Sequence, residues 1–176
     1  RFVAECQHHA PMDPPPALCA SYEELLAPSD VDAVYVPLPT GVRKAWLLRA
    51  AAAGKHVLSE KPTGTCAGDV REILDACRQH RVQFMDGVMF RHSRRLDRIR
   101  EVLDDGQSVG QVKRIASHFT CAVPEEFYSR DIRAHSALEP SGCLGDLGWY
   151  CIVFTLWAMN WRLPTKAVGH LLAERG

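Results

Sequence analysis

From residue 32 to residue 85 the chain alternates between strand-like and helix-like segments, and this alternation restricts the possible folds more than any other feature. Short apolar runs, which are typical of buried strands, occupy residues 32–38, 56–59 and 82–85. The stretches between them predict helices over residues 41–53 and 66–80, the first capped by Thr40 and ended by Gly54. Strands separated by helices predict a doubly wound α/β sheet with parallel strands, each buried on both faces.

The second strand-like segment runs directly into Glu60-Lys61-Pro62, which we consider a candidate ligand site. Pro62 stops the strand because its ring fixes the backbone and removes an N–H donor. Lys61 therefore lies beyond the carboxyl end of a strand, where open α/β sheets bind their ligands. The Lys61–Pro62 bond is predicted to be cis or sharply turned. A lysine before a proline is also typical of an exposed turn, and by itself the motif leaves that alternative open.

A different pattern follows the alternating segments. Residues 94–105 predict a helix with a solvated, arginine-rich face, and the alternation over residues 112–121 predicts a long strand. Residues 124–140 form a polar loop that contains Arg130-Asp131-Ile132-Arg133. Residues 144–160 are apolar nearly all round, which predicts a buried helix.

Asp146 and Tyr150 are four residues apart in this last helix, so they are predicted to share one face. A carboxylate and a phenol on one face are what a positioned acid/base pair needs. Each also has a purely structural explanation, because an acidic residue in the first turn stabilises a helix dipole and a tyrosine can be a core aromatic.

Glu60-Lys61-Pro62, followed by Asp146 and Tyr150 within the segment 142–150, resembles the glucose-fructose oxidoreductase / inositol dehydrogenase / MocA family. The resemblance extends from about Tyr22 to about Pro164, and the branch it most resembles is that of the dimeric dihydrodiol dehydrogenases. It implies an incomplete, Rossmann-like dinucleotide-binding domain over residues 1–88. Residues 89–176 would then begin an α+β substrate and oligomerisation domain with a mostly antiparallel sheet.

The resemblance also implies a function, an oxidoreductase that transfers a hydride between NAD or NADP and a sugar, inositol or cyclic diol. It implies catalytic roles for Lys61, Asp146 and Tyr150, in which Tyr150 is the acid/base and the lysine ammonium favours its ionised form. The residues implied to contact the cofactor are Leu38, Pro39, Thr40, Glu60, Lys61 and Pro62. The family often has asparagine where Thr40 stands and histidine where Arg43 stands, and the polar loop over residues 124–140 either borders the substrate pocket, as in relatives, or is a surface excursion.

The sequence contains no G-x-G-x-x-G, the loop that binds the pyrophosphate in a Rossmann domain. We interpret the chain, which begins with Arg1 rather than methionine, as a fragment that lacks this N-terminal unit and the C-terminal part. Alone it is expected to bind dinucleotide poorly and to expose an edge of the strand over residues 32–38. The alternative function is that of a truncated or non-catalytic member that senses a nucleotide or binds a partner.

Composition bears on partners and compartment. The net charge is zero at pH 7, which gives no reason to expect nucleic acid or an anionic membrane as a partner. The seven cysteines are odd in number and include no C-x-x-C, so neither a disulfide framework nor a metal site is expected. Reduced thiols indicate a cytoplasmic protein, with an export signal before Arg1 left open. The expected partners are a small polyol or diol and further copies of the chain, associated through the second-domain sheet.

Overall fold

The computed structural model describes residues 2–171, and the chain forms two compact units, residues 1–32 and 33–176. The first unit contains α1 (Phe2–His9) and the short α2 (Tyr22–Leu26), joined by a proline-rich loop. The Ser21 hydroxyl accepts a hydrogen bond from the Glu24 N–H at 3.1 Å and so caps α2.

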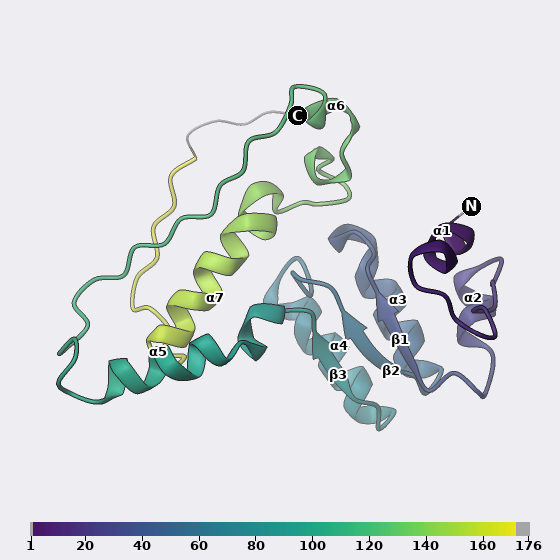
Figure 1. Ribbon diagram of the computed structural model, residues 1–176, viewed down its shortest axis with the longest axis horizontal. Helices are drawn as coiled ribbons and strands as arrows, with labels where there is room; N and C mark the ends of the chain where they lie inside the picture. The colour runs from purple at the N-terminus through teal and green to yellow at the C-terminus, as the bar shows by residue number, and fades with distance from the viewer. Residues whose placement is uncertain (1, 172–176) are drawn as a thin grey trace. The chain divides into compact units, whose positions relative to one another are not determined.

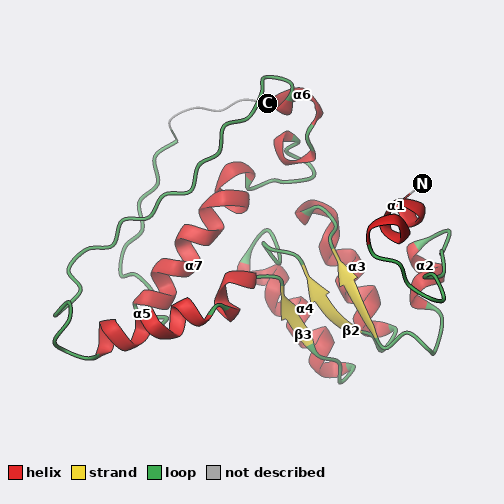
Figure 2. Cartoon of the chain, viewed as in Figure 1, coloured by secondary structure: helices red, strands yellow, loops and turns green. Residues whose placement is uncertain are grey.

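The second unit is built on a parallel sheet of three strands in the order β1-β2-β3 (Figures 1 and 2). The strands are β1 (Ala33–Val36), β2 (His56–Ser59) and β3 (Phe84–Asp86), and the helices between them are α3 (Thr40–Ala52) and α4 (Ala67–Gln79). The predicted parallel α/β arrangement is therefore confirmed. The second strand covers the predicted residues, whereas the third begins two residues later than predicted, after Gln83, whose N–H is bonded to the His56 side chain.

The two helices lie on one face of the sheet (Figure 1), and the apolar core lies between them and the strands. Its buried side chains are Val34, Val36, Leu47, Ala50, Ala51, Val57, Ile73 and Cys77. On the opposite face Tyr35, Leu58 and Met85 are paired across the three strands and are 53%, 38% and 44% exposed. The prediction that each strand is buried on both faces is therefore wrong, because the described helices of this unit cover one face of the sheet and leave these side chains exposed on the other.

An ion-pair cluster joins α3 to α4 on the helical side. The Lys44 Nζ atom lies 2.8 Å from Asp69 Oδ1 and 2.7 Å from Glu72 Oε2. The Asp69 carboxylate also accepts hydrogen bonds from the backbone N–H and the hydroxyl of Thr65, just before α4. The hydrogen bonds with Lys44 and Thr65 hold the pKa of Asp69 well below its ordinary value of 3.8. The same cluster raises the pKa of Lys44, through Asp69 first and Glu72 second.

The rest of this unit consists of helices and long irregular segments (Figure 2). After η1 (Met89–His92) come α5 (Arg94–Asp104), α6 (Phe127–Arg130), η2 (Ile132–Ala134), a π-helical turn η3 (Leu144–Gly148) and α7 (Trp149–Ala158). The strand predicted over residues 112–121 is not formed, because no segment within residues 2–171 pairs with it. For the same reason the antiparallel sheet expected after residue 88 is absent from the described residues.

The absent sheet also explains the exposure of α7. Only Val153 in this helix is fully buried, and Ile152 is 45% exposed, so the prediction of a helix buried all round is wrong. Helix α5 contacts the end of α7, where Arg100 donates to the Trp157 carbonyl at 2.6 Å and lies over the Trp157 ring. In the described part of the chain, no helix has the length and apolar character needed to span a bilayer.

Candidate active site

The carboxyl ends of β1 and β2 open into a cavity of about 540 Å³ that segments from the second half of the unit complete. From the strand ends, the cavity is lined by Leu38, Pro39, Glu60, Lys61 and Pro62, and from the later segments by Arg133, Glu139, Asp146 and Tyr150. The structure thus brings together all three residues predicted to be catalytic. It also places there every residue predicted to contact the cofactor except Thr40.

Lys61 forms the contacts that join the two sides of the cavity. Its Nζ atom donates to Asp146 Oδ1 at 2.6 Å and to the Asp146 backbone carbonyl at 2.8 Å. The two side chains are only 11% and 28% exposed, so water screens this ion pair less than it would at the surface. The bond between Lys61 and Pro62 is cis, as predicted. Because an ammonium has three N–H donors, one remains for a bound molecule after Asp146 has accepted two.

Tyr150 lies beside this ion pair. The Lys61 Nζ atom is 4.9 Å from the centre of the Tyr150 ring, on its face, so the contact between them is a cation–π interaction. The rings of Phe119 and Phe90 lie 5.2 Å and 6.1 Å from that of Tyr150 and fix its orientation. Asp146 is on the π-helical turn and Tyr150 on the first turn of α7, so the segment predicted as one α-helix begins with a π-helical turn and becomes α-helical just before Tyr150.

Glu60 links the cavity to the open face of the sheet. The Tyr35 hydroxyl donates to Glu60 Oε1 at 2.6 Å, and the Lys61 backbone N–H donates to Glu60 Oε2 at 3.1 Å. The hydrogen bond to Glu60 raises the pKa of Tyr35, so this phenol remains a proton donor. The Glu60 carboxylate is therefore held in place by groups on either side of it.

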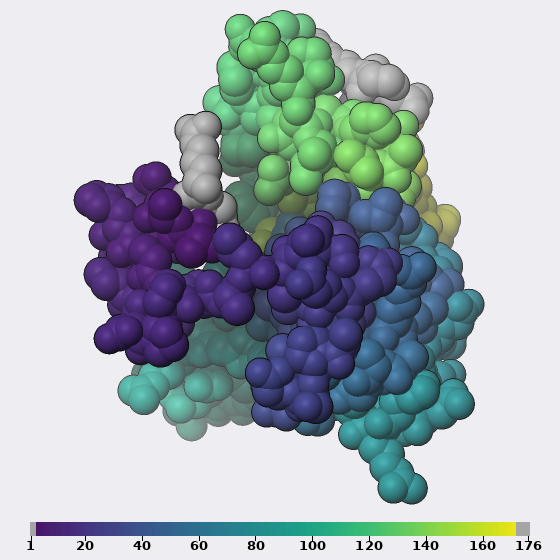
Figure 3. Space-filling model, turned by 90° about the vertical axis from the view of Figure 1, so that its right-hand side faces the viewer, coloured from purple at the N-terminus to yellow at the C-terminus, as the bar shows by residue number. Residues whose placement is uncertain are grey.

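The loop before η3 closes over the start of α3. Glu139 Oε1 accepts from the Thr40 N–H at 3.1 Å, and the Leu138 carbonyl accepts from the Gly41 N–H at 2.8 Å. In Figure 3 this green loop lies directly on the blue residues of α3. The prediction that Thr40 caps this helix is wrong, because Thr40 is its first residue and its buried hydroxyl has no hydrogen-bond partner among residues 2–171. Glu139 supplies the acceptor instead.

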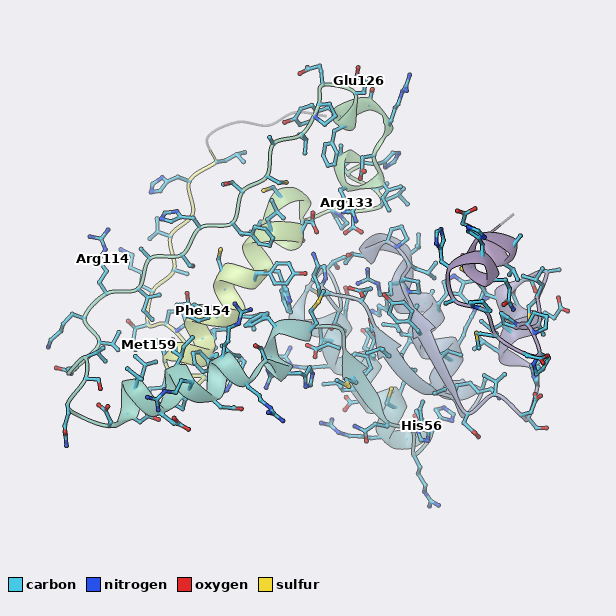
Figure 4. All side chains as sticks on the ribbon, viewed as in Figure 1. His56, Arg114, Glu126, Arg133, Phe154 and Met159 are labelled. Carbon is cyan, nitrogen blue, oxygen red and sulfur yellow. The ribbon has the colours of Figure 1, made fainter. Side chains whose placement is uncertain are left out.

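Arg133 lines the cavity, although the sequence identified it only as part of a polar loop. Its Nε atom lies 3.6 Å from Asp146 Oδ2 and its Nη1 atom 3.3 Å from Asp131 Oδ1. Figure 4 labels Arg133 on the segment after α6, and the side chain is about half exposed. Glu139, Tyr35 and Arg43 also line the cavity without having been predicted to do so. The only signal for Arg133 was its position in a loop that borders the substrate pocket of relatives.

These residues fit the nicotinamide end of a dinucleotide. The cavity has the volume of a small-molecule site, and its cations Arg43, Lys61 and Arg133 face the carboxylates of Glu60, Glu139 and Asp146. Leu38, Pro39 and Pro62 supply apolar surface against which a flat ring can pack. Within residues 2–171 no cluster of three or more His, Cys, Asp or Glu side chains is arranged to hold a metal ion.

Comparisons with known proteins show which proteins this chain resembles. Residues 4–88 match the GFO/IDH/MocA oxidoreductase family with the NAD-binding Rossmann fold. The chain is 37% identical to a dTDP-3,4-didehydro-2,6-dideoxy-alpha-D-glucose 3-reductase of Streptomyces violaceoruber, over 91% of this chain and 43% of that protein. It is 31% identical to the human trans-1,2-dihydrobenzene-1,2-diol dehydrogenase, over 86% of this chain and 43% of that protein.

The chain also resembles a solved structure of a related enzyme. A variant of KijD10, a 3-ketoreductase from Actinomadura kijaniata in complex with TDP-benzene and NADP, has a TM-score of 0.77 and 30% sequence identity. The match covers 89% of this chain and 46% of that chain. The chain thus spans somewhat less than half the length of the curated relatives above. Residues 4–88, with the strand-end motif that they contain, therefore belong to the Gfo/Idh/MocA family of oxidoreductases with an NAD-binding Rossmann fold.

Proposed function

We propose that the protein is an NAD(P)-dependent oxidoreductase that interconverts a secondary alcohol and a ketone on a sugar, inositol or cyclic diol. One observation carries the proposal, the position of the Lys61 amine between the Asp146 carboxylate and the face of the Tyr150 ring in a single cavity. An ion pair that served stability alone would not need a cavity of this size beside it.

The proposed chemistry assigns a task to each side chain. A bound nicotinamide would exchange the hydride with the substrate carbon. When the alcohol is oxidised, the proton on its oxygen passes to the Tyr150 phenolate oxygen, and in the reverse direction the Tyr150 hydroxyl returns it. The remaining N–H of Lys61 donates to the same substrate oxygen and stabilises negative charge on it. Asp146 holds the Lys61 amine in position through the two hydrogen bonds described above.

Two names among the relatives support the substrate class. One relative reduces a ketone on a dTDP-linked deoxysugar, and another oxidises a cyclic diol. Both substrates carry neighbouring oxygens on a six-membered ring, and the cavity offers both cations and carboxylates to such oxygens. We propose a ring of this kind as the substrate and either NAD or NADP as the cofactor.

The test is steady-state absorbance of reduced nicotinamide with the full-length protein and a panel of polyols, cyclic diols and keto sugars. Tyr150→Phe should lower kcat by about 10²–10⁴-fold with little change in cofactor affinity, the usual contribution of one acid/base group. Tyr128→Phe, the same change on α6 and outside the cavity, is the matched control. Near-normal turnover by Tyr150→Phe would refute its role. Cofactor binding without any turnover would favour the alternative of a nucleotide-sensing protein.

We further propose that residues 1–88 are part of a dinucleotide-binding domain and that residues 89–176 begin a substrate and oligomerisation domain. The end of the family match at residue 88 supports this boundary. A cytoplasmic location and a homodimer associated through the second domain complete the proposal. All seven cysteines are unpaired, which fits a reducing compartment.

A further inference from the structure

Arg43, the fourth residue of α3, is a buried cation in the wall of the cavity. It is 3% exposed, and burial lowers its pKa from the ordinary value. A guanidinium is rarely buried unless its N–H groups are bonded, because burial without partners costs several kcal/mol. The groups that accept hydrogen bonds from Arg43 therefore indicate the role of this buried side chain.

Those partners are backbone carbonyls at the ends of two strands. The Nε atom donates to the Leu38 carbonyl at 2.7 Å, and Nη1 donates to the Glu60 carbonyl at 2.8 Å and to the Pro62 carbonyl. Leu38 follows β1, whereas the other two residues stand immediately before and after Lys61. One guanidinium thus fixes the backbone on both sides of the lysine and ties it to the neighbouring loop.

We propose that Arg43 is a positioning residue for Lys61, an inference that rests on the proposed function. Because the carbonyls of residues 60 and 62 are fixed, the backbone of Lys61 has a defined position. From that position the Lys61 Nζ atom lies 2.6 Å from Asp146 Oδ1. The planar fork of an arginine can bond several carbonyls at once, whereas the single ammonium of a lysine cannot reproduce that arrangement. A change of arginine to lysine therefore keeps the charge but frees part of the loop.

The test compares Arg43→Lys with Arg49→Lys in the full-length protein, because Arg49 is in the same helix but does not line the cavity. The first readout does not depend on activity. It is the rate at which an amine-specific acylating reagent modifies Lys61, followed by mass spectrometry. We expect Arg43→Lys to raise this rate about tenfold, as expected for the loss of one hydrogen bond to a charged group. The rate in Arg49→Lys should match the wild-type rate.

The second readout is turnover. Arg43→Lys should lower kcat by about 10²-fold while the KM for the cofactor changes little, because a displacement of about 1 Å at a reacting group has an effect of that size. Arg43→Gln, which keeps a planar amide donor, serves if the lysine variant does not fold. An unchanged rate of Lys61 modification would overturn the inference, as would a loss confined to KM. If Lys61 becomes reactive but the wild-type protein turns over no substrate, the positioning role stands and the proposed function fails.

Discussion

Replacing Gly41 with alanine should displace the loop that closes over the start of α3. A Cβ atom at this position would lie much closer than 3.0 Å to the Ala137 carbonyl oxygen, a distance that real Cβ atoms essentially never show. It would also lie 3.2 Å from the Leu138 carbonyl oxygen. Both are backbone atoms, so no side-chain rotation relieves the overlap. Either the loop or the helix must move, and an irregular loop opens more easily than a helix that lies on the sheet.

The size of the effect follows from the contacts at stake. Displacement would break the neutral hydrogen bond from Gly41 to Leu138 and the bond from the Thr40 N–H to the Glu139 carboxylate. Together these are worth about 2–4 kcal/mol, since a bond to a charged group is the stronger kind. Alanine returns roughly 1 kcal/mol through its higher helix propensity. The net loss of about 1–3 kcal/mol should lower Tm by about 3–10 °C in a protein of this size.

Gly68→Ala is the matched control, because Gly68 is also the second residue of a helix, α4. Its Cβ would meet only the Cys66 sulfur, at 3.5 Å, so this variant should be as stable as wild type or more stable. Thermal unfolding measures both changes, and limited trypsin digestion after Arg133 reports whether the loop has opened. The reasoning is refuted if Gly41→Ala matches Gly68→Ala in Tm and Arg133 is cleaved no faster than in wild type.

Two further predictions concern charge. The folded-state pKa of the Asp69 carboxyl is depressed, so its ion pair with Lys44 should contribute stability at pH values well above the ordinary pKa of 3.8 and lose it as the pH falls below 3.8 toward the folded-state pKa. Asp69→Asn should therefore be less stable than wild type near pH 6, and acid titrations of unfolding should converge at low pH; an equal gap at every pH would contradict this. Asp146→Asn should lower the free energy of unfolding by about 1–3 kcal/mol in urea, because Lys61 loses its charged acceptor but keeps a neutral one. A variant as stable as wild type would show that this pair contributes nothing to the fold.

Elements with local signals were predicted well from the sequence. Gly54 ends α3 and an apolar run precedes Glu60, and together these signals determine where β2 begins and ends. The helical spacing of apolar residues predicts α4, so both elements have nearly the predicted bounds. The family motif identified Lys61, Asp146 and Tyr150, which the structure brings together. These inferences needed only neighbouring residues or a known order of motifs.

Features that depend on distant partners were not predicted. The cap of α3 comes from Glu139, 99 residues after Thr40, and no local pattern announces it. Arg43 has the appearance of any basic residue on a helix until the carbonyls that it bonds are known. Residues 112–121 alternate as a strand does, yet alternation cannot supply the second strand that a ladder requires.

The long sequence separations across the cavity have a consequence for folding kinetics. Lys61 and Asp146 are 85 residues apart, and closing a flexible loop of that length costs about 4 kcal/mol of chain entropy. This cost is about as large as the contribution of their two hydrogen bonds, so the pair adds little stability until the sheet and α7 have brought it together. The arrangement of side chains around the cavity is therefore acquired late, once residue 150 has left the ribosome, and it can be lost by local opening while β1, β2 and β3 remain paired.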